Sequence, residues 1–135
     1  MARISEAEFS RLKLSRANTV SEPTPRRGVM NGWESSFCRE VLEPERLLGK
    51  LDGYRFEAIT VTLYDGSTDV RKSRYTPDFM AWGEKDRRSF MRVFEVKGHR
   101  TRASIEKLKS AAQQYPMVDW CLVTGGPCNW EYEWL

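Results

Sequence analysis

The segments YTPDFM at residues 75–80 and FEVKG at residues 94–98 decide how this chain folds. If both segments are β-strands, their side chains alternate between the faces of a sheet and bring Asp78, Glu95 and Lys97 to one place. The neighbouring residues are Val, Phe and Met, and charges grouped on such a surface cost free energy unless something compensates. We expect a divalent metal ion between the two carboxylates as the compensation, and metal ions held in this way commonly act on phosphate groups.

Hydrophobic periodicity and turn signals predict an α/β chain with the element order αβββαβ. We expect a helix at about residues 31–43, strands at 54–64, 74–82 and 89–97, a helix at 101–115 and a strand at 118–124. The second helix forms a crossover connection between two strands. Pro77 cannot donate a hydrogen bond to a sheet, so it marks an edge, a bulge or a place where strands diverge. The alternating aromatic residues Trp130, Tyr132 and Trp134 predict a final strand with one aromatic face.

The first predicted helix carries an acidic residue on its inward face. Asn31 can cap this helix, and Pro44 and Gly49 are expected to end it. Glu34 lies three and four positions before the apolar Phe37 and Cys38, so its carboxylate points inward. Glu34 either interacts favourably with the positive end of the helix dipole or reaches the predicted metal site.

The length of 135 residues fits one domain, which we place at residues 31–135. Residues 1–30 are basic and contain Pro and Gly, and we expect a flexible arm or linker there. The sequence has no signal peptide and no apolar run of membrane length, so we expect a cytoplasmic protein with no membrane partner. Its three cysteines lack C-x-x-C spacing and there is one histidine, which argues against structural zinc.

Positive charge gathers around the carboxylates. Residues 70–109 carry 12 basic and 5 acidic side chains. A charge run is often only a solvated surface, but this placement favours a polyanionic partner. The candidate nucleic-acid contacts are Arg26, Arg27, Arg74, His99, Arg100, Arg102, Lys107 and Lys109.

A helix Glu, then Pro-Asp, then Glu-x-Lys on the next strand resembles the PD-(D/E)XK nuclease superfamily, and in particular small phage-encoded endonucleases and Holliday junction resolvases. The resemblance covers residues 31–124 and implies a restriction-endonuclease-like αβββαβ core, with a mixed central sheet flanked by helices. It implies Glu34, Asp78, Glu95 and Lys97 as catalytic residues. The implied cofactor is Mg²⁺, for which Mn²⁺ can substitute. Its implied ligands are Asp78, Glu95 and the Val96 carbonyl, with Glu34 binding directly, through water or at a second metal ion.

A glutamine on the second helix is a weaker candidate. Some members of the superfamily place a supporting Gln on this helix, and Gln113 is in the corresponding region. Its spacing to Tyr115 departs from the pattern, which leaves Gln113 a minor candidate.

The function that the resemblance implies is Mg²⁺-dependent DNA endonuclease activity, selective for branched DNA and carried out by a homodimer in the cytoplasm, such as that of a phage-infected bacterium. One alternative is a phage-type nuclease acting on linear, single-stranded or sequence-specific DNA or on RNA. An alternative of another class is a nucleic-acid-binding module without catalysis. Independently of these functions, a simple structural explanation of the motif is that Glu95 and Lys97 form an exposed ion pair on an edge strand, worth little energy.

Overall fold

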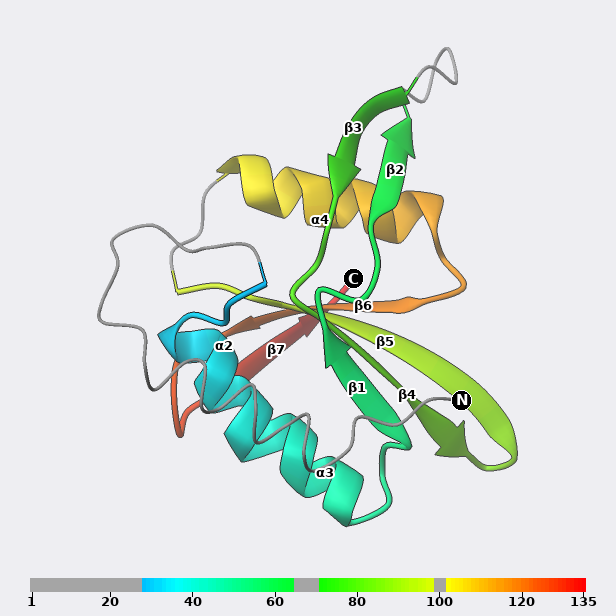
Figure 1. Ribbon diagram of the computed structural model, residues 1–135. Helices are drawn as coiled ribbons and strands as arrows, with labels where there is room; N and C mark the ends of the chain where they lie inside the picture. Colours follow the sequence, from blue (N-terminus) through cyan, green and yellow to red (C-terminus); the bar gives the residue numbers. More distant parts are fainter. Residues whose placement is uncertain (1–27, 65–70, 99–101) are drawn as a thin grey trace.

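The computed structural model describes residues 28–64, 71–98 and 102–135, and it is an α/β fold around a five-stranded mixed sheet (Figure 1). The arm proposed for residues 1–30 therefore lies almost entirely outside the described residues. The helical elements are α2 (Gly32–Phe37), the π-helical η1 (Cys38–Leu42), α3 (Glu43–Leu47) and α4 (Arg102–Gln114). The strands are β1 (Gly53–Phe56), β2 (Val61–Tyr64), β3 (Arg71–Tyr75), β4 (Phe79–Lys85), β5 (Arg88–Val96), β6 (Asp119–Thr124) and β7 (Glu131–Trp134).

The main sheet has the strand order β1-β4-β5-β6-β7. Neighbouring strands are antiparallel except β5 and β6, which are parallel and are joined by α4. This connection is the predicted crossover. Strands β2 and β3 form a separate antiparallel hairpin that projects from the main sheet beside α4 (Figure 1).

Two strands expected to be continuous are each divided between the two sheets. The predicted strand at 54–64 is β1 followed by β2, and the predicted strand at 74–82 is β3 followed by β4. The first break occurs at Glu57, whose φ of 47° is incompatible with an extended strand. The second occurs at Pro77, where the strands diverge, as one of the three interpretations of this proline predicted. The hydroxyl groups of Thr60 and Thr76 lie 2.7 Å apart and link the two chain segments at the divergence.

The first helix is longer than expected. It begins after the cap Asn31, as predicted, but continues through η1 and α3 to Leu47 rather than ending near residue 43. Within η1 the chain makes a wider turn, in which the Glu43 N–H donates to the Cys38 carbonyl. Pro44 lies in the first turn of α3, directly after the wider turn of η1. Gly49, with a φ of 77°, follows the helix end.

The hydrophobic core has one layer on each face of the sheet. In the first layer, Phe37 and Leu42 of the first helix pack on Phe79 and Phe94. In the second layer, α4 and the β2–β3 hairpin cover the other face, and the buried members are Leu63, Tyr75, Val93, Leu108, Ala111, Trp120 and Leu122. The sheet is thus flanked by helical elements on both faces, as expected (Figure 1).

The predicted final strand is present as β7, and its aromatic face packs on the first core layer. The ring centroid of Phe37 lies 5.4 Å from that of Trp130 and 6.3 Å from that of Tyr132. The rings of Phe94 and Trp134 are 5.9 Å apart. Among the helices that the structure describes, none has the length and apolarity to cross a membrane.

Candidate active site

The backbone register of β4 and β5 places Asp78 opposite Glu95. Phe79 pairs with Phe94 at the end of the antiparallel ladder, so Asp78 and Glu95 face each other at the next position. Lys97 directly follows β5, and its backbone N–H donates to the Val123 carbonyl of β6 at 2.9 Å. The carboxyl end of β5 is therefore held between two strands.

Glu95 is a buried residue of an interior strand. It is 4 % exposed, and β5 lies between β4 and β6. Its Oε1 lies 3.0 Å from Nζ of Lys97, and its Oε2 accepts a hydrogen bond of 2.6 Å from the hydroxyl of Tyr75. An exposed ion pair on an edge strand is therefore wrong as a description of Glu95 and Lys97.

Asp78 is held at the centre of the carboxylate cluster. Its Oδ2 accepts a hydrogen bond of 2.7 Å from the Val96 backbone N–H. Its side chain also hydrogen-bonds to that of Glu34. Burial, followed by repulsion from Glu95 and Glu34, raises the pKa of Asp78 to about 9. In the absence of another cation, Asp78 therefore keeps its proton at neutral pH.

Glu34 serves the helix and the cluster together. Its Oε2 accepts from the backbone N–H of Asn31 at 2.8 Å and its Oε1 accepts from Nδ2 of Asn31 at 3.0 Å, while Oδ1 of Asn31 accepts from the Glu34 N–H. This reciprocal capping box fixes the start of α2. Burial raises the pKa of the Glu34 carboxyl, although the hydrogen bonds from Asn31 and Asp78 act in the opposite direction. Glu34 therefore caps the helix and also interacts with Asp78, while its role as a metal ligand stays a prediction.

Lys97 is the cation of the cluster. Burial alone would lower its pKa, but the carboxylates of Glu95, Asp78 and Glu34 raise it above its usual value. Lys97 is consequently protonated at neutral pH. It can stabilise negative charge or orient a water molecule, but it cannot serve as a ready base.

The cluster fits a hard cation such as Mg²⁺, because every side-chain atom in it that could bind the ion is a carboxylate oxygen. The carboxylates repel one another, and the raised pKa of Asp78 keeps on it a proton that reduces that repulsion. A bound cation could take over this role. Across residues 28–64, 71–98 and 102–135, no three His, Cys, Asp or Glu side chains are already arranged as a metal site.

The structure places three of the predicted nucleic-acid contacts on one side of the sheet. Arg74 of β3 and Lys107 and Lys109 of α4 are exposed, and Nζ of Lys107 donates to the Arg74 carbonyl at 3.4 Å. Arg26, Arg27, His99 and Arg100 lie outside the described residues, as does the side chain of Arg102.

The glutamine candidate on α4 lies away from the cluster contacts. Gln113 is exposed on α4. Its neighbour Gln114 has a structural role instead: its Oε1 accepts from the Tyr64 N–H at 2.9 Å and its Nε2 donates to the Tyr64 carbonyl at 3.1 Å. These two bonds join α4 to strand β2.

Tyr75 is a site residue that sequence reasoning missed. It is 7 % exposed and lies in β3, yet its hydroxyl reaches Glu95 of β5. This contact depends on the divergence of β3 from β4 around Pro77. The sequence signal was only that an aromatic hydroxyl closely precedes Asp78, which does not identify its partner.

Comparisons with protein-family models, curated proteins and solved structures find no match for this chain.

Proposed function

We propose that this protein is a Mg²⁺-dependent DNA endonuclease with a restriction-endonuclease-like core. The observation that carries the proposal is the convergence of Asp78, Glu95, Glu34 and Lys97 at the end of β5. The element order and the helices on both faces of the sheet also support the fold assignment.

The burial of the carboxylates favours a nuclease over a module that only binds nucleic acid. Glu34 and Glu95 are 8 % and 4 % exposed, and burying carboxylates beside one another costs several kcal/mol unless they are compensated. A binding surface gains nothing from such groups, because they repel phosphate. A hydrolytic site gains a metal ligand from each one.

The residues of the cluster have separate roles in the proposed reaction. Asp78, Glu95 and the Val96 carbonyl would hold Mg²⁺, with Glu34 at the side. The bound ion would lower the pKa of a water molecule and neutralise charge on the phosphate. Lys97, kept protonated, would stabilise negative charge on the phosphate oxygens. Tyr75 would hold the Glu95 carboxylate in one orientation.

The substrate that we propose is branched DNA, cut by a homodimer. The excess of positive charge over residues 70–109 supports a polyanionic substrate. Paired cuts across a two-fold symmetric junction require two active sites, which a symmetric dimer supplies.

Cleavage of a labelled substrate panel tests the activity and its selectivity. The panel contains linear duplex, single-stranded DNA, a flap, a four-way junction and RNA, each incubated with Mg²⁺, Mn²⁺ or EDTA. We expect metal-dependent cleavage with preference for the junction, and none in EDTA. Preference for a linear, single-stranded or RNA substrate would support the proposed nuclease activity but contradict the proposed preference for branched DNA.

Two variants connect the activity to the site. Asp78→Asn should abolish cleavage and leave DNA binding unchanged or tighter, because a negative charge near the phosphate is removed. Glu84→Gln is the matched control, since Glu84 is exposed near the far end of β4. Wild-type turnover in Asp78→Asn, or no cleavage of any substrate by the wild-type protein, would refute the proposal.

A further inference from the structure

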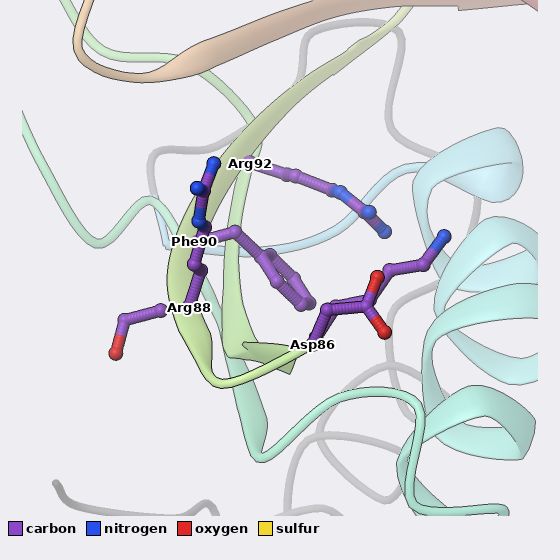
Figure 2. A pocket seen from close by; sticks show the side chains of 6 residues that line it. Asp86, Arg88, Phe90 and Arg92 are labelled. Atoms are coloured by element: carbon purple, nitrogen blue, oxygen red, sulfur yellow. The ribbon is translucent and has the colours of Figure 1, made fainter.

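A concave site separate from the carboxylate cluster lies at the turn between β4 and β5, at the far end of these strands from the carboxylates. It is a hollow of about 400 Å³. The lining residues are Lys85, Asp86, Arg88, Ser89, Phe90 and Arg92 (Figure 2). Phe90 packs against the core layer of the first helix, so the hollow opens on that face of the sheet. The exposed lysines of α4 are on the other face.

The lining of the hollow carries three cations and one acid. Within the described part of the chain, Lys85, Arg88 and Arg92 form no ion pair with any carboxylate. Lys85 and Arg88 pair across a two-residue turn, in which Asp86 and Arg87 have φ values of 54° and 65°. This left-handed geometry is that of a tight hairpin turn, and it fixes the strand ends that carry both cations.

Arg92 is held in place by aromatic rings. Its Cζ lies 4.1 Å from the centroid of Phe90 and 5.9 Å from that of Trp134. Figure 2 shows the guanidinium group extending above the Phe90 ring. Stacking restricts a planar guanidinium group before any ligand arrives, and such a group suits the oxygen atoms of a phosphate.

We propose that this hollow binds a backbone phosphate of a nucleic-acid strand, as a second contact separate from the carboxylate cluster. The choice of nucleic acid rests on the proposed function, whereas the preference for an anion follows from the three cations of the lining, which form no ion pair with any other described residue. Four of the six lining residues are exposed, and sites for free small ligands usually enclose most of the ligand. Trp134, which is 52 % exposed beside Arg92, offers a ring on which a base can stack.

The position of the hollow sets a minimum substrate length. Arg88 begins β5 and Glu95 lies seven residues later, or about 23 Å along the strand. This span corresponds to about seven nucleotides of duplex at about 3.4 Å per nucleotide. A strand bound at the carboxylate cluster must extend further than this to reach the hollow, because Glu95 alternates with Phe94 and lies on the opposite face of the sheet, where Tyr75 contacts it.

Anisotropy of a labelled oligonucleotide in EDTA measures binding without metal or cleavage. Arg88→Gln should raise the Kd of a single strand of about 20 nucleotides by about 3- to 10-fold. It should also reduce the slope of log Kd against log salt concentration by about 0.7, the contribution of one phosphate contact. Arg87→Gln removes the same charge at the adjacent, exposed residue outside the lining, and it should change the Kd less than twofold. Equal effects of the two variants would show general attraction and overturn the proposal.

Two further measurements test whether the hollow binds a strand phosphate or free phosphate, and whether the planar guanidinium group of Arg92 is needed. Arg92→Lys keeps the charge but loses the planar group, and we expect weaker strand binding. Inorganic phosphate, followed by NMR of the arginine side chains, should bind far more weakly than the oligonucleotide. Equal affinity would assign the hollow to a free phosphate group and overturn the strand assignment.

The proposal for the hollow and the proposal for the active site can be tested independently. In Mg²⁺, Arg88→Gln should still cut a short substrate at the wild-type rate, whereas Asp78→Asn should bind the strand in EDTA without cutting it in Mg²⁺. Loss of short-substrate cleavage in Arg88→Gln would contradict a contact separate from the carboxylate cluster.

Discussion

The hydroxyl of Tyr75 donates a hydrogen bond of 2.6 Å to Oε2 of Glu95, a residue on a strand that is not its neighbour in either sheet. Lys97 contacts the other oxygen of the same carboxylate at 3.0 Å. Burial, together with the charge of Glu95, raises the pKa of Tyr75 well above its usual value, so the phenol remains a donor. Glu95 is therefore held from two sides.

Tyr75→Phe should weaken Mg²⁺ binding and lower the cleavage rate, each by about 10-fold or more, because groups that orient metal ligands contribute about 10- to 100-fold. Calorimetry and cleavage assays measure the two effects. Tyr115→Phe is a matched control, since its hydroxyl donates a hydrogen bond of 2.6 Å to the Thr62 carbonyl, away from the cluster. If both variants lose only stability, Tyr75 does not position Glu95.

Lys97→Ala should remove most of the cleavage activity and retain Mg²⁺ binding. The variant loses the cation that faces the phosphate, while the carboxylates remain. Calorimetry with Mg²⁺ distinguishes the two effects, and Lys50→Ala, at an exposed residue after α3, controls for charge. Loss of metal binding in Lys97→Ala would instead give this lysine a structural role.

The metal-free protein should become less stable as the pH rises from about 4 to about 9. The pKa of Asp78 is raised from 3.8 to about 9 by burial and then by Glu95 and Glu34. The folded state therefore retains a proton that the unfolded chain releases, and the free energy of unfolding falls throughout this interval. Below pH 3.8 both states are protonated, so the stabilisation is complete there.

Urea unfolding in EDTA at pH 5 and pH 8.5 checks this prediction. Asp78→Asn should lose less stability between these pH values than the wild-type protein, by about 1 kcal/mol or more. With Mg²⁺ in place of EDTA at pH 8.5, the wild-type protein should be stabilised and the variant should not, because a ligand stabilises only the state that binds it. Parallel pH profiles of the two proteins would disprove the assigned role of Asp78.

Glu34→Gln should reduce cleavage less than Asp78→Asn does. A glutamine at this position can still accept from the Asn31 N–H, so the capping box and the helix start are preserved. Side-by-side turnover measurements in Mg²⁺ compare the two variants, with melting temperatures to verify folding. A loss equal to that of Asp78→Asn would make Glu34 a direct metal ligand.

Sequence reasoning predicted the α/β class, the crossover helix, the cap at Asn31 and the inward direction of Glu34 because each depends on local periodicity or capping. Both divided strands were expected to be continuous, although divergence was one interpretation of Pro77 and so marked the second break. Glu57 adopts a left-handed conformation that glutamate rarely favours, and no local signal marks it.

In the candidate site too, the features that depend on local sequence patterns were predicted and those that depend on tertiary arrangement were not. The position of Asp78 opposite Glu95 follows from strand pairing, which the sequence pattern indicated. The contact from Tyr75 could not be predicted, because it requires β3 to leave the main sheet and pack over one face of it. Tertiary arrangement, rather than residue type, determines this contact.

The two core layers meet at the carboxylate cluster, and this gives the cluster an unusual sensitivity. Glu34 is anchored through α2 and Phe37 to one layer, whereas Tyr75 belongs to the other. Local opening of either layer separates one of these residues from Asp78 or Glu95, even while the central strands keep their amide protons from exchange. We therefore expect ligand affinity at the cluster to depend on the folding equilibrium of both layers, so that a cavity made at Leu108, in the buried layer that includes Tyr75, should lower it.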